Sequence, residues 1–260
     1  MAAPLVVHQM HGCAEADLPR LLAALRRTVV ERNPGATHLY WSDADLDALL
    51  TQVYPRLLPA FRAACVGVQR SDLGRLVVLH VHGGLYLDTD VECLRPFGPP
   101  LVGGARLAVA PEPQAQVDAL YGAGGAPYLC NAVMYAPAGD AAVAACLDFV
   151  ERAWATHGAA MWAGAFDVLG GRMLTRTWRA RPDLFDVVPS AVVYPVNDLK
   201  LAGLPTHAAD VAAARAGSFG DDAQAVHWWA HTNFEGAAKG ALDRHDAAWP
   251  FLAELYRLEK

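Results

Sequence analysis

Two carboxylates one residue apart follow a short apolar segment about a third of the way along this chain. Asp88 and Asp90 come after the pair Gly83-Gly84 and the segment Leu85–Leu87. Carboxylates are hard oxygen ligands, and Mg²⁺ or Mn²⁺ usually binds through one or two of them together with substrate phosphates. If the segment is a strand that continues through the pair, both carboxylates face the same side and can reach one ion. The pattern therefore predicts a metal and diphosphate site, the alternative being an Asp-rich turn without a ligand.

A second pair of charges precedes the acidic pair. Asp72 and Arg75 are three residues apart, which places them on one face of a helix. They either form a polar clamp for sugar hydroxyls, with Arg75 near a phosphate or the departing oxygen, or a solvated ion pair of little energetic weight. The apolar residues 76–79 and Val81 predict a buried helix, and charges that lead into a buried helix favour the clamp.

Histidines near two predicted strands are further candidates. His227 stands at the end of the late apolar segment Ala225–Trp229, where it either closes a metal shell begun by the carboxylates or packs beside two tryptophans. His8, Gln9 and His11 follow the first apolar segment, and ligands of α/β sheets meet the carboxyl ends of strands. His11 is either a stacking partner for a nucleotide base or an ordinary loop residue.

Apolar periodicity and turn residues outline an α/β chain with a parallel sheet near its N-terminus. Strands are expected over Leu5–Val7, Thr37–Trp41, Leu85–Leu87, Leu107–Ala110, Ala132–Tyr135, Val187–Val196 and Ala225–Trp229. Helices are expected over Leu18–Arg32, after Ser42–Asp45, over Phe61–His82 as one or two helices, and over Ala141–Thr156 and Met173–Arg181. Residues Ala208–Ala216 are expected to form a small helix or a linker. The Pro- and Gly-rich stretch Pro111–Pro127 reads as a flexible loop, and Asn131 follows it. We find no internal repeat and no linker, so one domain over residues 1–260 is the simplest organisation.

Composition excludes several classes of protein. The net charge of −6 provides no basic footprint for nucleic acid and no polybasic patch for a membrane. No run approaches the roughly 18 apolar residues of a membrane span, and residues 1–8 do not resemble a signal peptide. The 5 cysteines form no metal-binding or disulfide pattern, which favours a reducing compartment. We expect a soluble cytoplasmic protein without an integral membrane segment, one that can still act at the periphery of a membrane carrying its acceptor.

Taken together, these segments resemble the DXD-containing sugar transferases of glycosyltransferase family 32. The family signature of Ser-Asp-x-x-Arg, an apolar helix and Gly-Gly-x-Tyr-x-Asp-x-Asp is matched at Ser71, Asp72, Arg75, Gly83, Gly84, Tyr86, Asp88 and Asp90. Weaker similarity covers Val7–Gln9, Trp41–Asp43, Gly170–Thr175 and His227–Trp229. The chain departs from the family at His11, where a Trp is usual, and at Leu169–Gly171, where the family has Thr-Gly-Pro.

The resemblance implies a GT-A fold, a Rossmann-like α/β arrangement with a mixed central sheet. It also implies metal-dependent transfer of a hexose from a UDP- or GDP-hexose to a hydroxyl acceptor on a glycan, lipid or other molecule, with retention of anomeric configuration. Asp90 would be the main ligand of Mn²⁺ or Mg²⁺, His227 would close the metal shell, and Asp88 would hold the ribose of the donor and support the ion through water. Asp72 would contact the sugar hydroxyls, and Arg75 would lie at the sugar–phosphate junction. The donor would also meet His8, Gln9, His11, Tyr86 and Asn131. Polysaccharide biosynthesis is the expected setting.

Two other classes of function stay open. The same fold and residues serve a protein that binds a nucleotide-sugar or carbohydrate without catalysis. The other class is a metal-dependent phosphohydrolase, since the strand followed by Asp-x-Asp also resembles the haloacid-dehalogenase phosphatases. Those phosphatases carry the pair after their first strand and have Thr or Val where Glu92 stands.

Overall fold

A computed structural model describes residues 4–121, 123–164, 169–196 and 219–229 of this chain. Its strands are β1 Val6–Met10, β2 Thr37–Trp41, β3 Gly84–Leu87, β4 Val91–Cys93, β5 Leu107–Pro111, β6 Leu129–Ala136, β7 Phe185–Val187 and β8 Ala225–His227. Its α-helices are α1 Arg20–Arg32, α2 Asp43–Val53, α3 Leu58–Arg62, α4 Gly67–His82, α5 Gln114–Tyr121, α6 Ala141–His157 and α8 Gly170–Ala180. The helix expected over Ala208–Ala216 lies outside the described residues.

Six of the strands form one mixed sheet in the order β2-β1-β3-β6-β5-β7. The neighbours of β1 run parallel to it, whereas β6 runs antiparallel to both β3 and β5. As a result, the carboxyl ends of β1 and β3 and the beginning of β6 lie at one edge of the sheet. Strands β4 and β8 form a separate antiparallel ribbon beside it. The mixed sheet and its helices confirm the expected α/β class.

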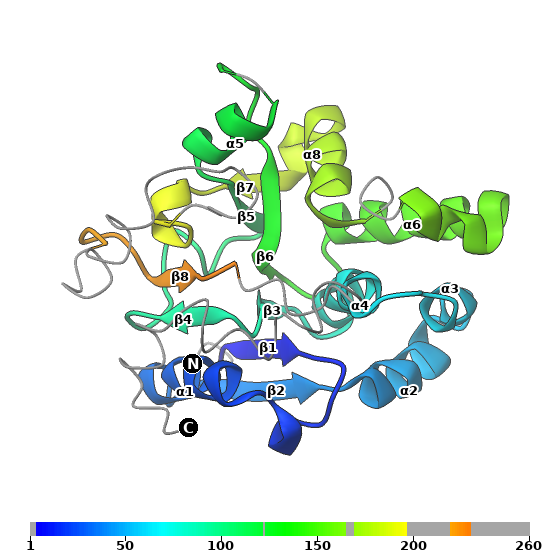
Figure 1. Cartoon of the computed structure of the whole chain (residues 1–260), viewed down its shortest axis with the longest axis horizontal. Coiled ribbons are helices and arrows are strands. Elements are labelled where there is room, and N and C mark those ends of the chain that lie inside the picture. The colour runs from blue at the N-terminus through cyan, green and yellow to red at the C-terminus, as the bar shows by residue number, and fades with distance from the viewer. Residues whose placement is uncertain (1–3, 122, 165–168, 197–218, 230–260) are drawn as a thin grey trace.

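The sheet has a helical layer on one side and a thinner cover on the other. Helices α2, α4, α6 and α8 lie on one side, and α1 lies with the β4–β8 ribbon on the opposite side (Figure 1). Alternate residues along the strands supply the two cores, as the period of a strand requires. In β3, Tyr86 faces the helical layer, while Leu85 and Leu87 face the side of Val29 and Cys93.

The turn from α4 into β3 depends on two glycines. Helix α4 ends at Gly83, which has φ of 63°, and Gly84 follows with φ of 104°. A Cβ atom at Gly84 would lie 2.3 Å from the carbonyl oxygen of Val6, so the close approach of β1 also requires glycine there. This turn fixes the direction in which β3 leaves the buried helix, and therefore where Asp88 comes to lie.

Several expected elements need correction. The Pro- and Gly-rich loop contains helix α5, which begins just after Pro113, where the backbone N–H groups of Gln116 and Val117 donate to the Pro113 carbonyl. The stretch Phe61–His82, expected to hold one or two helices, contains the end of α3 and the whole of α4, so α3 begins earlier than expected. The strand expected over Val187–Val196 is wrong: only its first residue belongs to β7, because Pro189 starts a 3₁₀ turn.

No helix within the described ranges combines the length and the apolar character needed to cross a membrane.

We expect Gly84→Ala to lower the free energy of unfolding by about 2 kcal/mol or more, because it combines left-handed backbone strain with a clash against backbone. Gly35→Ala is the matched control, since a Cβ atom there meets nothing within 4 Å. Urea unfolding of both variants checks this, and equal stability of the two would contradict the assigned turn geometry.

Candidate metal and donor site

The candidate site lies at the edge where β1 and β3 end and β6 begins. Asp88 follows β3 directly, and its backbone N–H donates to the carbonyl oxygen of Ala132 in β6 at 2.8 Å. Asn131 stands at the same edge, near the start of β6. Ligands of open α/β sheets bind outside the carboxyl ends of strands, so this edge is where a substrate is expected.

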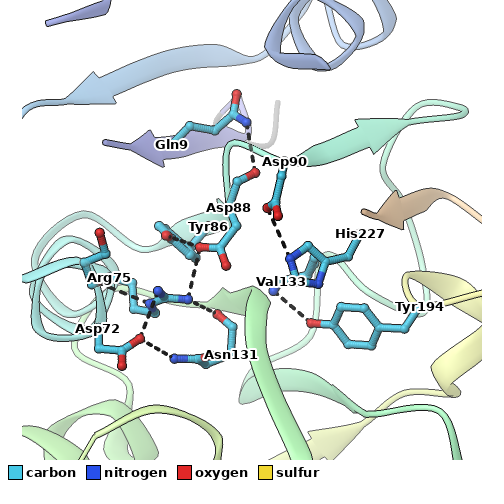
Figure 2. Close-up of polar contacts among 11 residues, drawn as sticks. Gln9, Asp72, Arg75, Tyr86, Asp88, Asp90, Asn131, Val133, Tyr194 and His227 are labelled. Carbon is cyan, nitrogen blue, oxygen red and sulfur yellow. Dashed lines mark hydrogen bonds and ion pairs between the residues drawn. The ribbon is translucent and has the colours of Figure 1, made fainter. Parts of the chain in front are cut away.

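The two carboxylates of the acidic pair come from a turn and not from a continuous strand. Strand β3 ends at Leu87, β4 begins at Val91, and the Val91 N–H donates to the Asp88 carbonyl at 3.2 Å. The argument from strand alternation was therefore wrong. Asp88 turns toward Arg75 and Tyr86, whereas Asp90 turns toward His227, and both still border one small volume (Figure 2).

His227 reaches the acidic pair through the β4–β8 ribbon. Val91 lies opposite His227 in the ribbon, and the Trp228 N–H donates to the Asp90 carbonyl at 3.1 Å. His227 Nε2 lies 3.1 Å from Asp90 Oδ1, and both side chains are less than one-tenth exposed. The ring of His227 also packs against the rings of Tyr194 and Trp229, whose centroids lie 6.0 Å and 4.2 Å away, and these contacts hold its orientation.

Asp88, Asp90 and His227 together form a donor set that suits a divalent cation. One ligand atom from each lies within 4.8 Å of the others. Two carboxylates suit Mg²⁺ and Mn²⁺, and the imidazole nitrogen favours Mn²⁺ because Mg²⁺ strongly prefers oxygen ligands. The residues present therefore fit the metal that the sequence predicted, while the identity of the ion stays a prediction.

Arg75 is the hub of the neighbouring polar network (Figure 2). It is 3% exposed, and its Nη2 lies 2.9 Å from Asp72 Oδ1 while its Nη1 lies 3.1 Å from Asp88 Oδ1. Nη1 also donates to the Asn131 carbonyl at 2.7 Å, and Nε donates to the Ser71 carbonyl at 3.2 Å. The Tyr86 ring lies beneath the guanidinium, 4.7 Å from its carbon. The pair Asp72–Arg75 is therefore buried, which argues against the alternative of a solvated ion pair.

Burial and charge shift the proton affinities of this network. Burial raises the pKa of Asp72 and of Asp88, while the Arg75 guanidinium acts in the opposite direction on both. Burial alone would lower the pKa of Arg75, but the anionic groups around it raise the pKa, so Arg75 stays charged. Burial also raises the pKa of Tyr86, which keeps its phenol protonated as a donor to Asp88 Oδ1 at 2.5 Å.

One carboxylate oxygen of Asp72 is left open toward α8. Oδ1 accepts from Asn131 Nδ2 at 2.7 Å in addition to its contact with Arg75. On the other side, a Cβ atom at Gly170, which has φ of 72°, would lie 3.3 Å from Oδ2. Gly170 begins α8 and therefore leaves Oδ2 uncovered by a side chain.

The remaining predicted donor contacts lie around β1 and β3, and several serve the protein itself. His8 is buried: Nε2 donates to the Gly83 carbonyl at 2.8 Å and Nδ1 accepts from Trp41 Nε1 at 3.1 Å. Burial lowers the His8 pKa to about 4, so the ring is neutral. Gln9 Nε2 donates to the Asp88 carbonyl at 3.3 Å, which positions the acidic turn. Tyr86 is fully buried beneath Arg75.

Direct contact of His8 or Tyr86 with a donor would require breaking these contacts, so the geometry favours positioning roles for them. Both ring nitrogens of His8 have protein partners. His11 is partly buried after β1, its Nδ1 lies 3.2 Å from Cys13 Sγ, and Asp43 and Asp90 are the charges that act on it. Contact of His11 or Asn131 with a donor stays a prediction.

Sequence reasoning missed Tyr194, whereas it had named Trp229 as a packing neighbour of His227 and as part of the late His227–Trp229 similarity. The Tyr194 hydroxyl accepts from the Val133 N–H at 2.9 Å, and Trp229 Nε1 donates to the Val196 carbonyl at 2.9 Å. Both therefore tie the ring contacts of His227 to the rest of the fold. The sequence signal for Tyr194 is its aromatic character alone, since it belongs to no motif and only the fold brings it to His227.

Comparison with known proteins identifies a family model that matches the part of the chain carrying the acidic pair. Residues 19–108 match the family model described as the glycosyltransferase sugar-binding region containing DXD motif. This part of the chain is therefore similar to the sugar-binding region of DXD-containing glycosyltransferases. The match includes Asp72, Arg75, Asp88 and Asp90 and confirms the resemblance stated from the sequence.

Curated relatives extend over the same region. A mannosyl phosphorylinositol ceramide synthase of Saccharomyces cerevisiae is 31% identical over 96 residues, which are 37% of this chain and 25% of that protein. Inositol phosphoceramide mannosyltransferase 3 of Schizosaccharomyces pombe is 26% identical over 98 residues, 38% of this chain and 27% of that protein. The match thus spans about a quarter of the length of these relatives.

A solved structure, the PaToxG glycosyltransferase, aligns with a TM-score of 0.50 at 16% identity, covering 93% of this chain and 84% of that one. At this identity the likeness concerns the fold, and it confirms the expected GT-A type of glycosyltransferase fold.

We expect Arg75→Met to lower the free energy of unfolding by about 3–5 kcal/mol at neutral pH, because it leaves Asp72 and Asp88 buried without their cation. Without Arg75 the pKa values of both carboxyl groups rise further, and a neutral acid needs no cation. The difference in the free energy of unfolding between Arg75→Met and the native chain therefore becomes smaller as pH falls from 8 to 5.

Urea unfolding across this pH range measures the effect. Arg56→Met is the control, since Arg56 pairs with Glu151 at the surface with 84% of its side chain exposed, and its loss changes little. A loss of stability in Arg75→Met that does not vary with pH would mean that Arg75 contributes only packing and not charge pairing.

Proposed function

We propose that this chain transfers a hexose from a nucleotide diphosphate sugar to a hydroxyl acceptor. The observation that carries the proposal is the convergence of Asp88, Asp90 and His227 beside a second polar group formed by Asp72, Arg75 and Asn131. The first group suits a cation with a diphosphate, and the second suits a sugar. The family region over residues 19–108 supports the same reaction.

In this proposal Asp90 and His227 hold a divalent cation, preferably Mn²⁺, and Asp88 completes the set through the oxygen that Arg75 and Tyr86 leave open. When bound, the ion neutralises the charge of the diphosphate as the nucleotide departs. The protein fixes its ligands beforehand. Arg75 and Tyr86 orient Asp88, while Tyr194 and Trp229 orient His227.

The sugar would lie between Asp72 and α8. Asp72 Oδ2 accepts a hydrogen bond from a sugar hydroxyl, because Oδ1 is occupied by Arg75 and Asn131, whereas a Cβ atom at Gly170 would lie 3.3 Å from Oδ2 and the glycine leaves that space open. Arg75 acts mainly as a positioning residue, since it contacts Asp72, Asp88 and two backbone carbonyls at once. Asp72 Oδ2 thereby offers the nucleotide-sugar a hydrogen-bond acceptor whose direction is fixed by the protein.

We further propose that the anomeric configuration is retained. Among the described residues, the carboxylates of this site are Asp72, Asp88 and Asp90, and each already has a binding or ligand role. No further carboxylate is assigned as a covalent nucleophile, so the acceptor would attack on the face from which the nucleotide leaves. NMR of the first-formed product gives the configuration, and an inverted product or a trapped glycosyl-enzyme would refute this step.

The matched relatives are named mannosyltransferases, which makes mannose the first sugar to test. A panel of GDP-mannose, UDP-glucose and UDP-galactose, with and without Mn²⁺, tests both the sugar and the nucleotide. We expect one donor to raise the melting temperature in the presence of Mn²⁺ and to be consumed when a hydroxyl acceptor is supplied.

We expect Asp90→Asn to lower Mn²⁺ affinity by more than about 100-fold, because loss of groups that merely orient ligands already costs about 10- to 100-fold. Calorimetric titration with Mn²⁺ alone measures this, with the exposed Asp17→Asn as control. Unchanged affinity in Asp90→Asn would remove Asp90 from the metal site. Donor binding without turnover would favour a binding protein, and release of inorganic phosphate would favour a phosphohydrolase.

We expect Gly170→Ala to weaken donor binding at least about tenfold by covering Asp72 Oδ2. Gly139→Ala is a close control, because Gly139 has the same φ of 72° while a Cβ atom there meets nothing within 4 Å. Both variants therefore carry similar backbone strain, and calorimetry with the donor separates them. Equal donor affinity in the two would show that the sugar does not lie against Gly170.

A further inference from the structure

Gln9 connects the acidic turn to a second buried arginine. Its side chain is fully buried in β1, and Nε2 donates to the Asp88 carbonyl at 3.3 Å (Figure 2). At the other end of the amide, Oε1 accepts from Arg26 Nη1 at 3.0 Å. The three groups therefore form a chain of hydrogen bonds that runs from α1 through the sheet to the residue after β3.

Arg26 permits only one orientation of this amide. A guanidinium only donates, a backbone carbonyl only accepts, and the side-chain amide of glutamine has one end of each kind. With Arg26 on one side and the Asp88 carbonyl on the other, Oε1 faces Arg26 and Nε2 faces Asp88. The reversed amide would bring its oxygen against the Asp88 carbonyl and its N–H groups against the cation, so both contacts would be repulsive.

The ion pair of Arg26 does not account for its burial. Arg26 Nε lies 2.6 Å from Glu15 Oε1, but the Glu15 side chain is 56% exposed, whereas that of Arg26 is 7% exposed. An ion pair with an exposed partner contributes little, and replacing a buried charge pair by apolar residues is often neutral. The ring of Tyr40 covers one side of the guanidinium, with its centroid 5.3 Å from the guanidinium carbon. The contact that an apolar residue could not supply is the one with Gln9.

The acidic turn is held at the backbone carbonyls of both its acidic residues. The Asp88 carbonyl accepts from Gln9 and from the Val91 N–H, while the Asp90 carbonyl accepts from the Trp228 N–H. Among these contacts, the one from Gln9 comes from a side chain, so its direction depends on what holds that side chain. Groups that orient metal ligands in this way affect metal affinity without touching the metal.

We propose that Arg26 is a positioning residue for the metal site. As a donor-only group it fixes the amide of Gln9, and Gln9 in turn fixes the turn that carries Asp88 and Asp90. The effect of Arg26 on Mn²⁺ binding rests on the proposed function, whereas its effect on the Asp88 carbonyl requires neither metal, donor nor turnover.

NMR of the metal-free full chain tests the first step, because the carbonyl-carbon resonance of Asp88 reports on the hydrogen bond from Gln9. We expect this resonance to move upfield in Gln9→Met, which removes the donor. Arg26→Gln should move it in the same direction, since an amide both donates and accepts and no longer selects one orientation of Gln9. Arg26→Lys keeps a donor-only group and should leave the resonance near its native position.

Arg27→Gln is the matched control, because Arg27 is the exposed neighbour of Arg26 on α1 and undergoes the same chemical change. It should leave the Asp88 resonance unchanged. A native-like resonance in Arg26→Gln, or equal shifts in Arg26→Gln and Arg26→Lys, would overturn the proposal. Urea unfolding confirms that each variant is folded.

Calorimetric titration with Mn²⁺ alone tests the second step. Arg26→Gln should lower Mn²⁺ affinity about tenfold, the lower end of what loss of a ligand-orienting group costs. Added to Gln9→Met, it should cause no further loss, because the two residues act through one contact. Additive losses, or an affinity in Arg26→Gln equal to that in Arg27→Gln, would show that Arg26 does not act on the metal site through Gln9.

The two measurements separate this inference from the proposed function. A native chain that binds no Mn²⁺, while the Asp88 carbonyl still responds to Arg26, would refute the metal site and retain the positioning of the turn. Mn²⁺ binding that is the same in the native chain and in the Arg26 and Gln9 variants would retain the metal site and refute the role of Arg26.

Discussion

The rest of the site depends on burying one arginine between two carboxylates. Arg75 sits within α4 at 3% exposure, and a buried charge of this kind is tolerated only with close partners. Asp72 comes from the same helix, whereas Asp88 comes from the turn after β3. The pairing therefore fastens the buried helix to the edge of the sheet. Tyr86 adds to this from beneath, with its ring under the guanidinium and its hydroxyl on Asp88.

The second half of the site depends on a contact between distant parts of the chain. The β4–β8 ribbon brings His227 next to Asp90 through the backbone pairing of its two short strands. Side-chain contacts of Tyr194, Trp228 and Trp229 hold the ribbon in place. Trp228 Nε1 donates to Glu92 Oε2 at 3.0 Å, which fixes the ribbon one residue beyond the site. The metal ligands are thus set by two independent anchors, the Arg75 network for Asp88 and the ribbon for His227.

Local signals in the sequence predicted the first anchor well and the second only in part. The Gly-Gly turn, the buried helix and the charges at Asp72, Arg75, Asp88 and Asp90 lie within about twenty residues, so spacing alone places them together. Strand β4 and helix α5 were missed, because three residues are too few to show a period and Pro113 hides a helix start inside a turn-rich stretch. The register that pairs Val91 with His227 arises from long-range packing, which periodicity does not encode.

Arginine rather than lysine at position 75 follows from the number of acceptors that surround it. Its planar fork contacts two carboxylates and two backbone carbonyls in fixed directions, whereas an ammonium is a point charge that would leave part of this set unpaired. The same fork occupies one oxygen of Asp72 and one of Asp88. The second oxygen of Asp72 is therefore left for the sugar, and the second oxygen of Asp88 is left for the metal. In each carboxylate, one oxygen stabilises the fold and the other can serve the proposed reaction.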